Sequence, residues 1–187
     1  MANIDKKFVK FYNQNKRKLF SYVYFKVKDD QVAYDITSNV FVKLYKKAKK
    51  DKDIFKYALA WCYKVALNEV IDYVRSSYYN KVKLESDTNN QNSKEDKTNL
   101  DKPLMIKEYD FADALQKDAD YHIILEALNK LNQADREVIT FRLLEELPFK
   151  DISVIFDITE AAAKMRYKRA LQKLKELIKM QENKKDE

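Results

Sequence analysis

Residues 148–178 read PFKDISVIFDITEAAAKMRYKRALQKLKELI and decide the fold of the C-terminal part of the chain. Apolar side chains recur at helical spacing from Phe149 to Phe156 and again beyond residue 160. Asp157 stands in the break between the two stretches, where its readiness to adopt a left-handed backbone suits a tight turn. The pattern of short helix, turn and amphipathic helix predicts a helix-turn-helix, whose second helix enters the major groove of DNA.

The second helix of this motif is expected to have one buried and one basic face. Four residues spaced by four, three and four form the buried stripe: Ala163, Tyr167, Ala170 and Leu174. The opposite face is centred on Ala161, Met165, Lys168 and Gln172, with Lys164, Arg166, Arg169 and Lys173 on its flanks. Between residues 160 and 175 six side chains are basic and only Glu160 is acidic. Such a face suits phosphates and base edges, although an ordinary solvated basic face is the alternative interpretation.

Helical periodicity also dominates the rest of the chain. It predicts a helix through Leu19, Phe20, Val23 and Val27, then helices near 33–48 and 55–77. Beyond residue 120 it predicts one helix through Ile123, Ile124, Ala127, Leu128 and Leu131, another through Val138, Ile139 and Leu143, and helices near 149–156 and 160–180. Asp135 and Thr159 stand where helix N-caps are expected. The predicted fold class is therefore all-α.

Charge divides the chain into unlike segments. Residues 1–84 carry a net charge of +11, from 19 basic and 8 acidic side chains, and residues 85–120 carry −5, from 5 and 10. The segment after residue 84 is almost devoid of apolar side chains at its start, so it cannot bury enough surface to offset the entropy of ordering. We therefore predict two small helical domains, 1–84 and 119–182, joined by a flexible acidic linker, 85–118, and followed by a charged tail, 183–187.

The composition argues against enzymatic and cofactor chemistry. The 187 residues include no glycine, which excludes glycine-rich phosphate loops and the dinucleotide fingerprint. One cysteine, Cys62, and one histidine, His122, make a Cys/His metal site or nucleophile pair improbable, so no metal or cofactor is expected. We interpret Cys62 as a packed small apolar residue, His122 as structural or solvent-facing, and Glu145-Glu146 as solvated charges. The sequence has neither an apolar signal core nor a membrane span, so we expect a cytoplasmic protein.

A second motif lies in the basic N-terminal segment. Residues 33–48, AYDITSNVFVKLYKKA, predict an amphipathic helix with Asp35 and Asn39 on its polar side. Residues 61–79, WCYKVALNEVIDYVRSSYY, combine aromatic rings with basic and amide side chains, a combination that suits single-stranded nucleic acid because bases stack on rings while cations follow phosphates. Aromatic residues at helical spacing more often belong to a core, and this is the preferred interpretation of Trp61.

These motifs together resemble those of an extracytoplasmic-function (group IV) sigma factor of bacterial RNA polymerase, in the sigma-70 family. AYDITSNVFVKLY (33–45) and WCYKVALNEVIDYVR (61–75) are similar to two segments of the family's region 2. LNKLNQADREVITFRLLEELPFKDISVIFDITEAAAKMRYKRALQKL (128–174) resembles region 4 throughout. The resemblance covers both domains in order, and it implies a protein without enzymatic activity that directs core polymerase to promoters.

The resemblance also implies a role for particular residues. The helix with Asp35, Asn39 and Phe41 should dock on the clamp helices of the largest polymerase subunit, and the flap of the other large subunit should also be contacted. Residues expected to recognise the −10 element and hold its melted non-template strand are Asp53, Phe55, Lys64, Asn68 and Arg75. Residues expected at the −35 element are Lys164, Met165 and Lys168 for reading and Arg166 and Arg169 for phosphate contacts. Because relatives are usually restrained by an anti-sigma factor, the expected partners are core polymerase, promoter DNA and an anti-sigma factor.

Two other classes of function remain open on the residues alone. One is a helix-turn-helix regulator that binds duplex DNA without polymerase, and the other is an adaptor whose basic N-terminal domain binds an acidic protein. Tight duplex binding by the isolated chain would favour the regulator. A stable protein complex without nucleic-acid binding would favour the adaptor, whereas a sigma factor initiates transcription specifically only after core polymerase is added.

Overall fold

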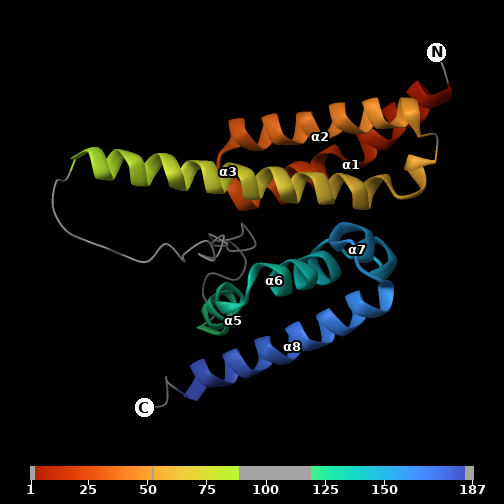
Figure 1. Cartoon of the computed structure of the whole chain (residues 1–187). Coiled ribbons are helices and arrows are strands. Elements are labelled where there is room, and N and C mark those ends of the chain that lie inside the picture. The colour runs from red at the N-terminus through yellow and green to blue at the C-terminus, as the bar shows by residue number, and fades with distance from the viewer. Residues whose placement is uncertain (1–2, 52, 89–118, 184–187) are drawn as a thin grey trace.

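The computed structural model describes residues 3–51, 53–88 and 119–183, and Figure 1 shows how they are arranged. Every regular element in these ranges is helical, which confirms the all-α prediction. Two helical domains lie side by side, the first formed by the N-terminal helices and the second by the C-terminal ones. Among the described helices, none combines the length and the apolar character needed to cross a lipid bilayer.

Three long helices form the N-terminal domain. These are α1 (Asn3–Val27), α2 (Asp30–Lys50) and α3 (Ala58–Thr88), with a short 3-10 turn, η1 (Ile54–Lys56), before α3. Each of the three helices packs on the other two, because each has an apolar stripe at helical spacing. The buried residues at their centre include Leu19, Val23, Val40, Leu44, Cys62, Ala66 and Val70.

The C-terminal domain consists of shorter helices and one long one. In chain order they are α5 (Ala119–Lys130), α6 (Gln133–Ile139), the π-helical turn η3 (Thr140–Leu144), α7 (Phe149–Phe156) and α8 (Glu160–Asn183). Helix α8 packs on α5, α6 and α7, so it is the central helix of this domain. The described part of α3 extends four residues beyond the predicted boundary at residue 84. The rest of the predicted linker (89–118) and tail residues 184–187 lie outside the described residues.

Sharp turns in this glycine-free chain are made by residues that adopt a left-handed backbone. Lys28, Glu146 and Asp157 have φ angles of 55°, 55° and 53°. Lys28 ends α1 by donating its backbone N–H to the Tyr24 carbonyl at 2.8 Å. A backbone in this conformation brings Cβ close to the following carbonyl oxygen, at a cost of about 1–2 kcal/mol for an ordinary residue. Packing and hydrogen bonds of the flanking helices must offset that cost at each turn.

Two local predictions in the C-terminal domain are wrong for identifiable reasons. The N-cap of α6 is Asn132, whose Oδ1 accepts the Asp135 N–H at 2.8 Å, so Asp135 lies in the first turn instead of capping it. Leu143 is 53 % exposed and does not extend the buried stripe of Val138 and Ile139. In η3 the Glu145 N–H bonds to the Thr140 carbonyl, five residues back, and this π-turn rotates the residues that follow out of α-helical register.

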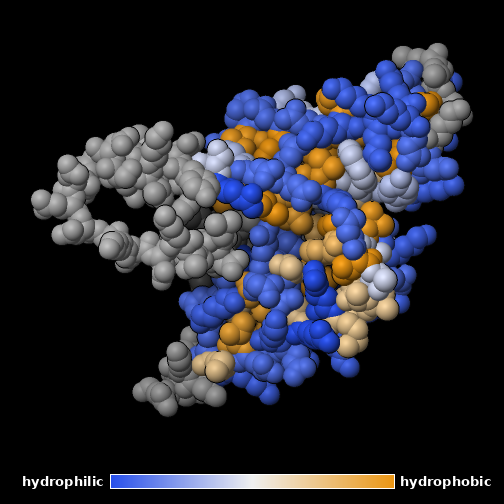
Figure 2. All heavy atoms as spheres, in the orientation of Figure 1, coloured by the Kyte–Doolittle hydropathy of each residue, from blue (hydrophilic) through white to orange (hydrophobic). Residues whose placement is uncertain are grey.

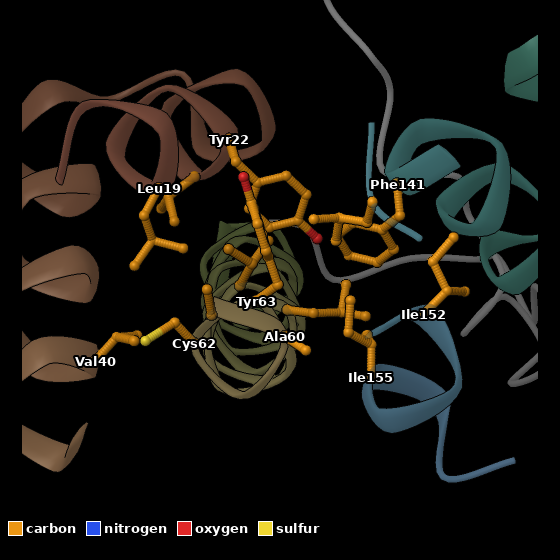
Figure 3. Packing of buried hydrophobic residues seen from close by; sticks show 14 of the residues in the cluster. Leu19, Tyr22, Val40, Ala60, Cys62, Tyr63, Phe141, Ile152 and Ile155 are labelled. Atoms are coloured by element: carbon orange, nitrogen blue, oxygen red, sulfur yellow. The ribbon is translucent and has the colours of Figure 1, made fainter. Parts of the chain in front are cut away.

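The two domains share one apolar core. Helix α7 packs along α3, and Figure 3 shows Ile155 of α7 next to Ala60 of α3. Phe141 of η3 is fully buried and its ring lies 5.4 Å from the Tyr22 ring and 5.5 Å from the Tyr63 ring. The described domains are therefore packed against each other, not held only by the segment between them.

Candidate nucleic-acid interface

The helix-turn-helix predicted from the sequence is present. Its first helix, α7, has the predicted bounds, and Asp157 follows it with φ 53° and ψ 44°. The Asp157 N–H closes the turn on the Ser153 carbonyl. The second helix, α8, begins at Glu160, and the Thr159 hydroxyl caps it by accepting the Ala162 N–H at 3.1 Å. The left-handed Asp157 therefore sets the angle at which α8 leaves the turn, and the predicted N-cap at Thr159 is confirmed.

The two faces of α8 are those expected from helical spacing. Ala163 and Ala170 are fully buried, and Tyr167 and Leu174 are half-buried, with the Tyr167 ring 5.5 Å from the Phe149 ring. The opposite residues are exposed: Ala161, Met165, Lys168 and Gln172. Figure 2 shows that hydrophilic residues cover most of the visible face of the molecule, with smaller apolar patches among them. The exposed face of α8 therefore takes no part in the hydrophobic core.

The basic side chains of this face differ in how firmly they are held. Lys164 pairs with Glu160 at 2.7 Å, and the Arg166 guanidinium lies 5.4 Å from the centre of the Phe156 ring. Lys168 and Arg169 are exposed and form no ion pair with any residue that the structure describes. An unpaired cation meets a phosphate without first losing a protein partner. Lys168 and Arg169 are therefore the basic side chains of the set that are most readily available to DNA.

The residues expected at the −10 element lie on α3 and on the loop before it. Lys64, Asn68 and Arg75 follow one another at steps of four and seven residues, so they lie within about 40° of each other around the helix axis. Asn68 and Arg75 are exposed, while Lys64 is half-buried. Arg75 approaches Asp72 at 3.9 Å, a weak contact that leaves the guanidinium accessible. These three side chains form one polar stripe.

The loop before α3 is held by Asp51. Its Oδ1 accepts the Asp53 N–H at 2.9 Å and its Oδ2 accepts the Tyr57 hydroxyl at 2.8 Å. The hydrogen bond from Tyr57, followed by that from Asp53, lowers the pKa of the Asp51 carboxyl. Asp53 itself is exposed and pairs with Lys56 at 2.8 Å, and Phe55 is half-buried against Phe11, with ring centres 6.2 Å apart. The loop presents Asp53 to solvent but keeps much of Phe55 in the core.

The residues expected to dock on polymerase lie on α2, where they differ in exposure. Asp35 and Asn39 are exposed, whereas Phe41 is only 3 % exposed and packs on Tyr12 with ring centres 4.8 Å apart. A groove of about 630 Å³ lies between α1 and α2, with Phe41 among the residues that line it. Its other lining residues are Asp5, Phe8, Val9, Tyr12, Ser38, Val42, Tyr45 and Lys46. Phe41 can therefore contribute to docking only as part of this groove.

Some residues that no sequence pattern connects lie together where the two domains meet. Lys64, expected at the −10 element, forms an ion pair with Asp157 in the turn of the helix-turn-helix. Glu145 is not the solvated charge expected, because its carboxylate is half-buried and accepts a hydrogen bond from the Tyr63 hydroxyl. Burial raises the pKa of Glu145, and the hydrogen bond from Tyr63 opposes that rise. No local pattern could have indicated these contacts, since the partners are 82 and 93 residues apart.

Cys62 and His122 were considered from the sequence as possible reactive or metal-binding residues. Cys62 is buried, and burial raises the pKa of its thiol to about 12, in agreement with a packed apolar role. The His122 side chain lies outside the described residues. In the described ranges no three His, Cys, Asp or Glu residues gather as ligands for a metal ion.

Comparisons with known proteins agree with this geometry. The sigma-70 region 2 model matches residues 11–78, which comprise most of the N-terminal domain, and the sigma-70 region 4 model matches residues 121–174, which contain the helix-turn-helix. Two sigma-70 regions in the family's order, together covering most of the chain, define a promoter-recognition subunit of RNA polymerase. The chain belongs to the sigma-70 family, a class of proteins that are not enzymes.

Solved structures with the same arrangement are distant in sequence. The sigma factor RpoE of Bartonella quintana, solved with the anti-sigma factor NepR, is 20% identical with a TM-score of 0.57, over 93% of this chain and 98% of that one. CnrH, solved with the cytosolic domain of CnrY, is 16% identical with a TM-score of 0.59, over 92% of this chain and 88% of that one. At these identities the likeness supports the fold alone. A comparison with curated protein sequences finds no match.

Proposed function

We propose that this sigma factor reads promoters through two separate surfaces of its domains. The exposed face of α8, with Lys164, Met165 and Lys168, reads the −35 element, while Arg166 and Arg169 contact its phosphates. The stripe of Lys64, Asn68 and Arg75 on α3, with Asp53 and Phe55 of the preceding loop, recognises the −10 element and holds its melted strand. The observation that supports this assignment best is the exposed basic face of α8, which is the second helix of a well-formed helix-turn-helix.

Docking on core polymerase is assigned to α2. Asp35 and Asn39 are exposed polar groups on this helix, and the groove lined by Phe41 provides apolar surface beside them. An interface with a polar edge and an apolar centre is typical of stable protein complexes. The second contact with polymerase, through the flap, is assigned to the C-terminal domain. A protein that acts with RNA polymerase is expected to function in the cytoplasm. An anti-sigma factor is a further proposed partner.

Run-off transcription with cognate core polymerase tests the proposal. Genomic fragments are transcribed with core alone, with the chain alone and with both, while native gel electrophoresis follows binding of the chain to core. We expect initiation at defined start sites only when both are present. Core binding without initiation on any fragment, or the same initiation with and without the chain, contradicts the proposed function.

A pre-melted template separates recognition from melting. Asn68→Ala should reduce initiation on a duplex promoter and reduce it less on a template whose −10 region is held open by mismatches. Arg75→Ala, further along the same stripe, serves as the comparison, because a phosphate contact should matter on both templates alike. An Asn68→Ala variant that is unimpaired on duplex DNA would reject its assignment.

A further inference from the structure

The loop that joins α2 to α3 carries two of the residues proposed to recognise the −10 element. Asp53 is exposed and Phe55 is half-buried, and both follow Asp51 within four residues. Figure 1 shows this loop at one end of the N-terminal domain, between the last turn of α2 and the first turn of α3. A loop binds best when its free shape already matches its bound shape, because little ordering entropy is then lost on binding. The contacts that hold this loop therefore bear on what it can recognise.

Asp51 is hydrogen-bonded at both ends of the loop. Its backbone N–H donates to the Lys47 carbonyl at 2.8 Å, which ends α2. Its carboxylate accepts two further hydrogen bonds: Oδ1 from the Asp53 N–H at 2.9 Å and Oδ2 from the Tyr57 hydroxyl at 2.8 Å. One side chain thus ties the end of α2 to the residue that precedes α3.

Tyr57 is itself fixed in place by its backbone. Its N–H donates to the Ile54 carbonyl at 3.0 Å, and its carbonyl accepts the Trp61 N–H at 3.0 Å in the first turn of α3. The Ile54 side chain is fully buried, so this part of the loop is anchored in the core. The Tyr57 hydroxyl therefore transmits the position of α3 to Asp51, and through Asp51 to the Asp53 backbone.

The same geometry makes Asp51 a poor partner for DNA. Both of its carboxylate oxygens already accept hydrogen bonds, and a carboxylate repels the phosphates of a nearby strand. The hydrogen bond from Tyr57, followed by that from Asp53, lowers the pKa of Asp51, so the group stays ionised at physiological pH. An ionised acceptor strengthens both hydrogen bonds. Asp51 is thus suited to hold the loop and not to read a base.

We propose that Asp51 and Tyr57 form a clasp that positions the loop, so that Asp53 and Phe55 meet the −10 element in an arrangement that exists before DNA binds. The inference deepens the proposed function and rests on it, because it takes Asp53 and Phe55 as −10 contacts. Asp51 and Tyr57 are positioning residues, which act on DNA only through these two neighbours. Without the clasp the loop adjusts to several bases, since flexible loops are a common basis of promiscuous binding. Loss of the clasp should therefore reduce discrimination between bases more than it reduces binding as a whole.

Amide exchange in the free chain tests the clasp without DNA. Transfer of magnetisation from water, measured by NMR at neutral pH, gives the exchange rate of the Asp53 N–H. Asp51→Ala removes the acceptor of that N–H, and the rate should rise roughly 2–10-fold, as expected for the loss of one hydrogen bond. Tyr57→Phe removes only the hydroxyl that holds Oδ2, and it should raise the same rate by a smaller factor.

Base discrimination by the holoenzyme tests the positioning role. A promoter found by run-off transcription is prepared as a fork-junction template with a single-stranded −10 region, and each base of that region is replaced in turn. For each variant the ratio of the dissociation constants of the substituted and original templates is measured. Tyr57→Phe should lower the largest ratio roughly 2–10-fold. Damage to the overall fold would instead weaken binding to every template alike and leave the ratios unchanged.

A double-variant cycle and a matched control make the test specific. Asp51→Ala combined with Tyr57→Phe should be no worse than Asp51→Ala alone, because both changes remove the same hydrogen bond. Tyr24→Phe is the control, since the hydroxyl of the half-buried Tyr24 on α1 donates no hydrogen bond to any residue that the structure describes. Its exchange rates and ratios should equal those of the unaltered protein. Circular dichroism confirms that each variant retains its helices.

The outcomes separate the clasp from the proposed function. Equal Asp53 exchange in the unaltered chain, Asp51→Ala and Tyr57→Phe overturns the clasp whatever the templates show. Faster exchange with unchanged ratios overturns the positioning role, while Asp53→Ala and Phe55→Ala test the −10 assignment independently. If neither of these two variants alters any ratio, the −10 assignment in the proposed function is wrong, and the positioning role is wrong as well.

Discussion

The Lys64 ammonium of α3 forms an ion pair with the Asp157 carboxylate, which lies in the turn of the helix-turn-helix in the other domain. The two side chains are 29 % and 76 % exposed, so water screens their attraction. Exposed pairs of this kind contribute between 0 and about 1 kcal/mol. The pair thus marks where the two candidate DNA-binding surfaces meet, while Glu137 and Phe141 are the residues buried in the contact between the domains.

Substitutions of Asp157 should affect stability through the backbone more than through charge. Asp157→Gly relieves the left-handed conformation, whereas Asp157→Val imposes a β-branched side chain on it. We expect the free energy of unfolding of the Val variant to be lower than that of the Gly variant by at least about 1 kcal/mol. Asp157→Asn, which removes only the charge, should stay within about 1 kcal/mol of the unaltered protein. Urea denaturation followed by circular dichroism measures all three, and equal stability of the Gly and Val variants would contradict the assigned turn.

The N-cap of α8 is a second determinant of the helix-turn-helix. Thr159→Ala removes the hydroxyl that accepts the Ala162 N–H and should lower the free energy of unfolding by about 1 kcal/mol. Thr159→Ser retains an acceptor at the same place and is the matched control. Thermal unfolding should rank the unaltered protein and the Ser variant together, above the Ala variant. An Ala variant as stable as the Ser variant would show that the cap contributes nothing.

Lys168 should contribute to binding of the −35 element as a phosphate or base-edge contact. Lys168→Ala should weaken binding of holoenzyme to promoter DNA and reduce the slope of log K against log salt by about one unit, because one fewer counterion is released. Lys179→Ala is the control: this exposed residue lies on nearly the same side of α8, three turns further on. Binding titrations across a range of salt concentrations decide the matter. Identical slopes for the two variants would reject the assignment of Lys168.

The Cys62 thiol should report on the integrity of the N-terminal core. Its pKa of about 12 leaves a thiolate fraction at pH 8 roughly 10³-fold smaller than that of an unfolded chain with the ordinary value of 9.0. Alkylation by iodoacetamide at pH 8 should therefore be at least that much slower in the folded protein than in concentrated urea. Cys62→Ala, which has no thiol, supplies the background, and rapid alkylation of the folded chain would contradict the burial of Cys62.

The same shift fixes the sign of a pH effect on stability. Below the ordinary thiol pKa, both folded and unfolded chains carry the protonated group, so Cys62 adds nothing to the pH dependence of the free energy of unfolding. As the pH rises from about 9 toward 12, only the unfolded chain ionises, so the contribution of Cys62 to the free energy of unfolding decreases. Cys62→Ala should remove that part of the alkaline loss, and urea titrations at several pH values compare the two proteins.

Much of the candidate site follows from local pattern. The helix Phe149–Phe156, the left-handed Asp157, the Thr159 cap and the exposed Lys168 all depend on residues within about two turns of each other, where helical spacing and turn chemistry act. The same patterns failed where two local choices compete. Asn132 and Asp135 are both good N-caps, and only the structure shows which one is used.

The sequence by itself determined that this chain is helical, that its N-terminal domain is basic while the charges of its C-terminal domain nearly cancel, and that α8 has a basic face. These properties depend on spacing and composition within single segments. Only the tertiary structure decided that Glu145 is half-buried, that Leu143 is exposed beyond a π-turn and that Glu137 is paired with Tyr22 and Lys26. The contacts of Glu137 and Glu145 join residues more than 80 positions apart. Helical periodicity indicates that a face is apolar or charged, but not which distant face it meets, because that choice depends on the shape and charge of both surfaces together.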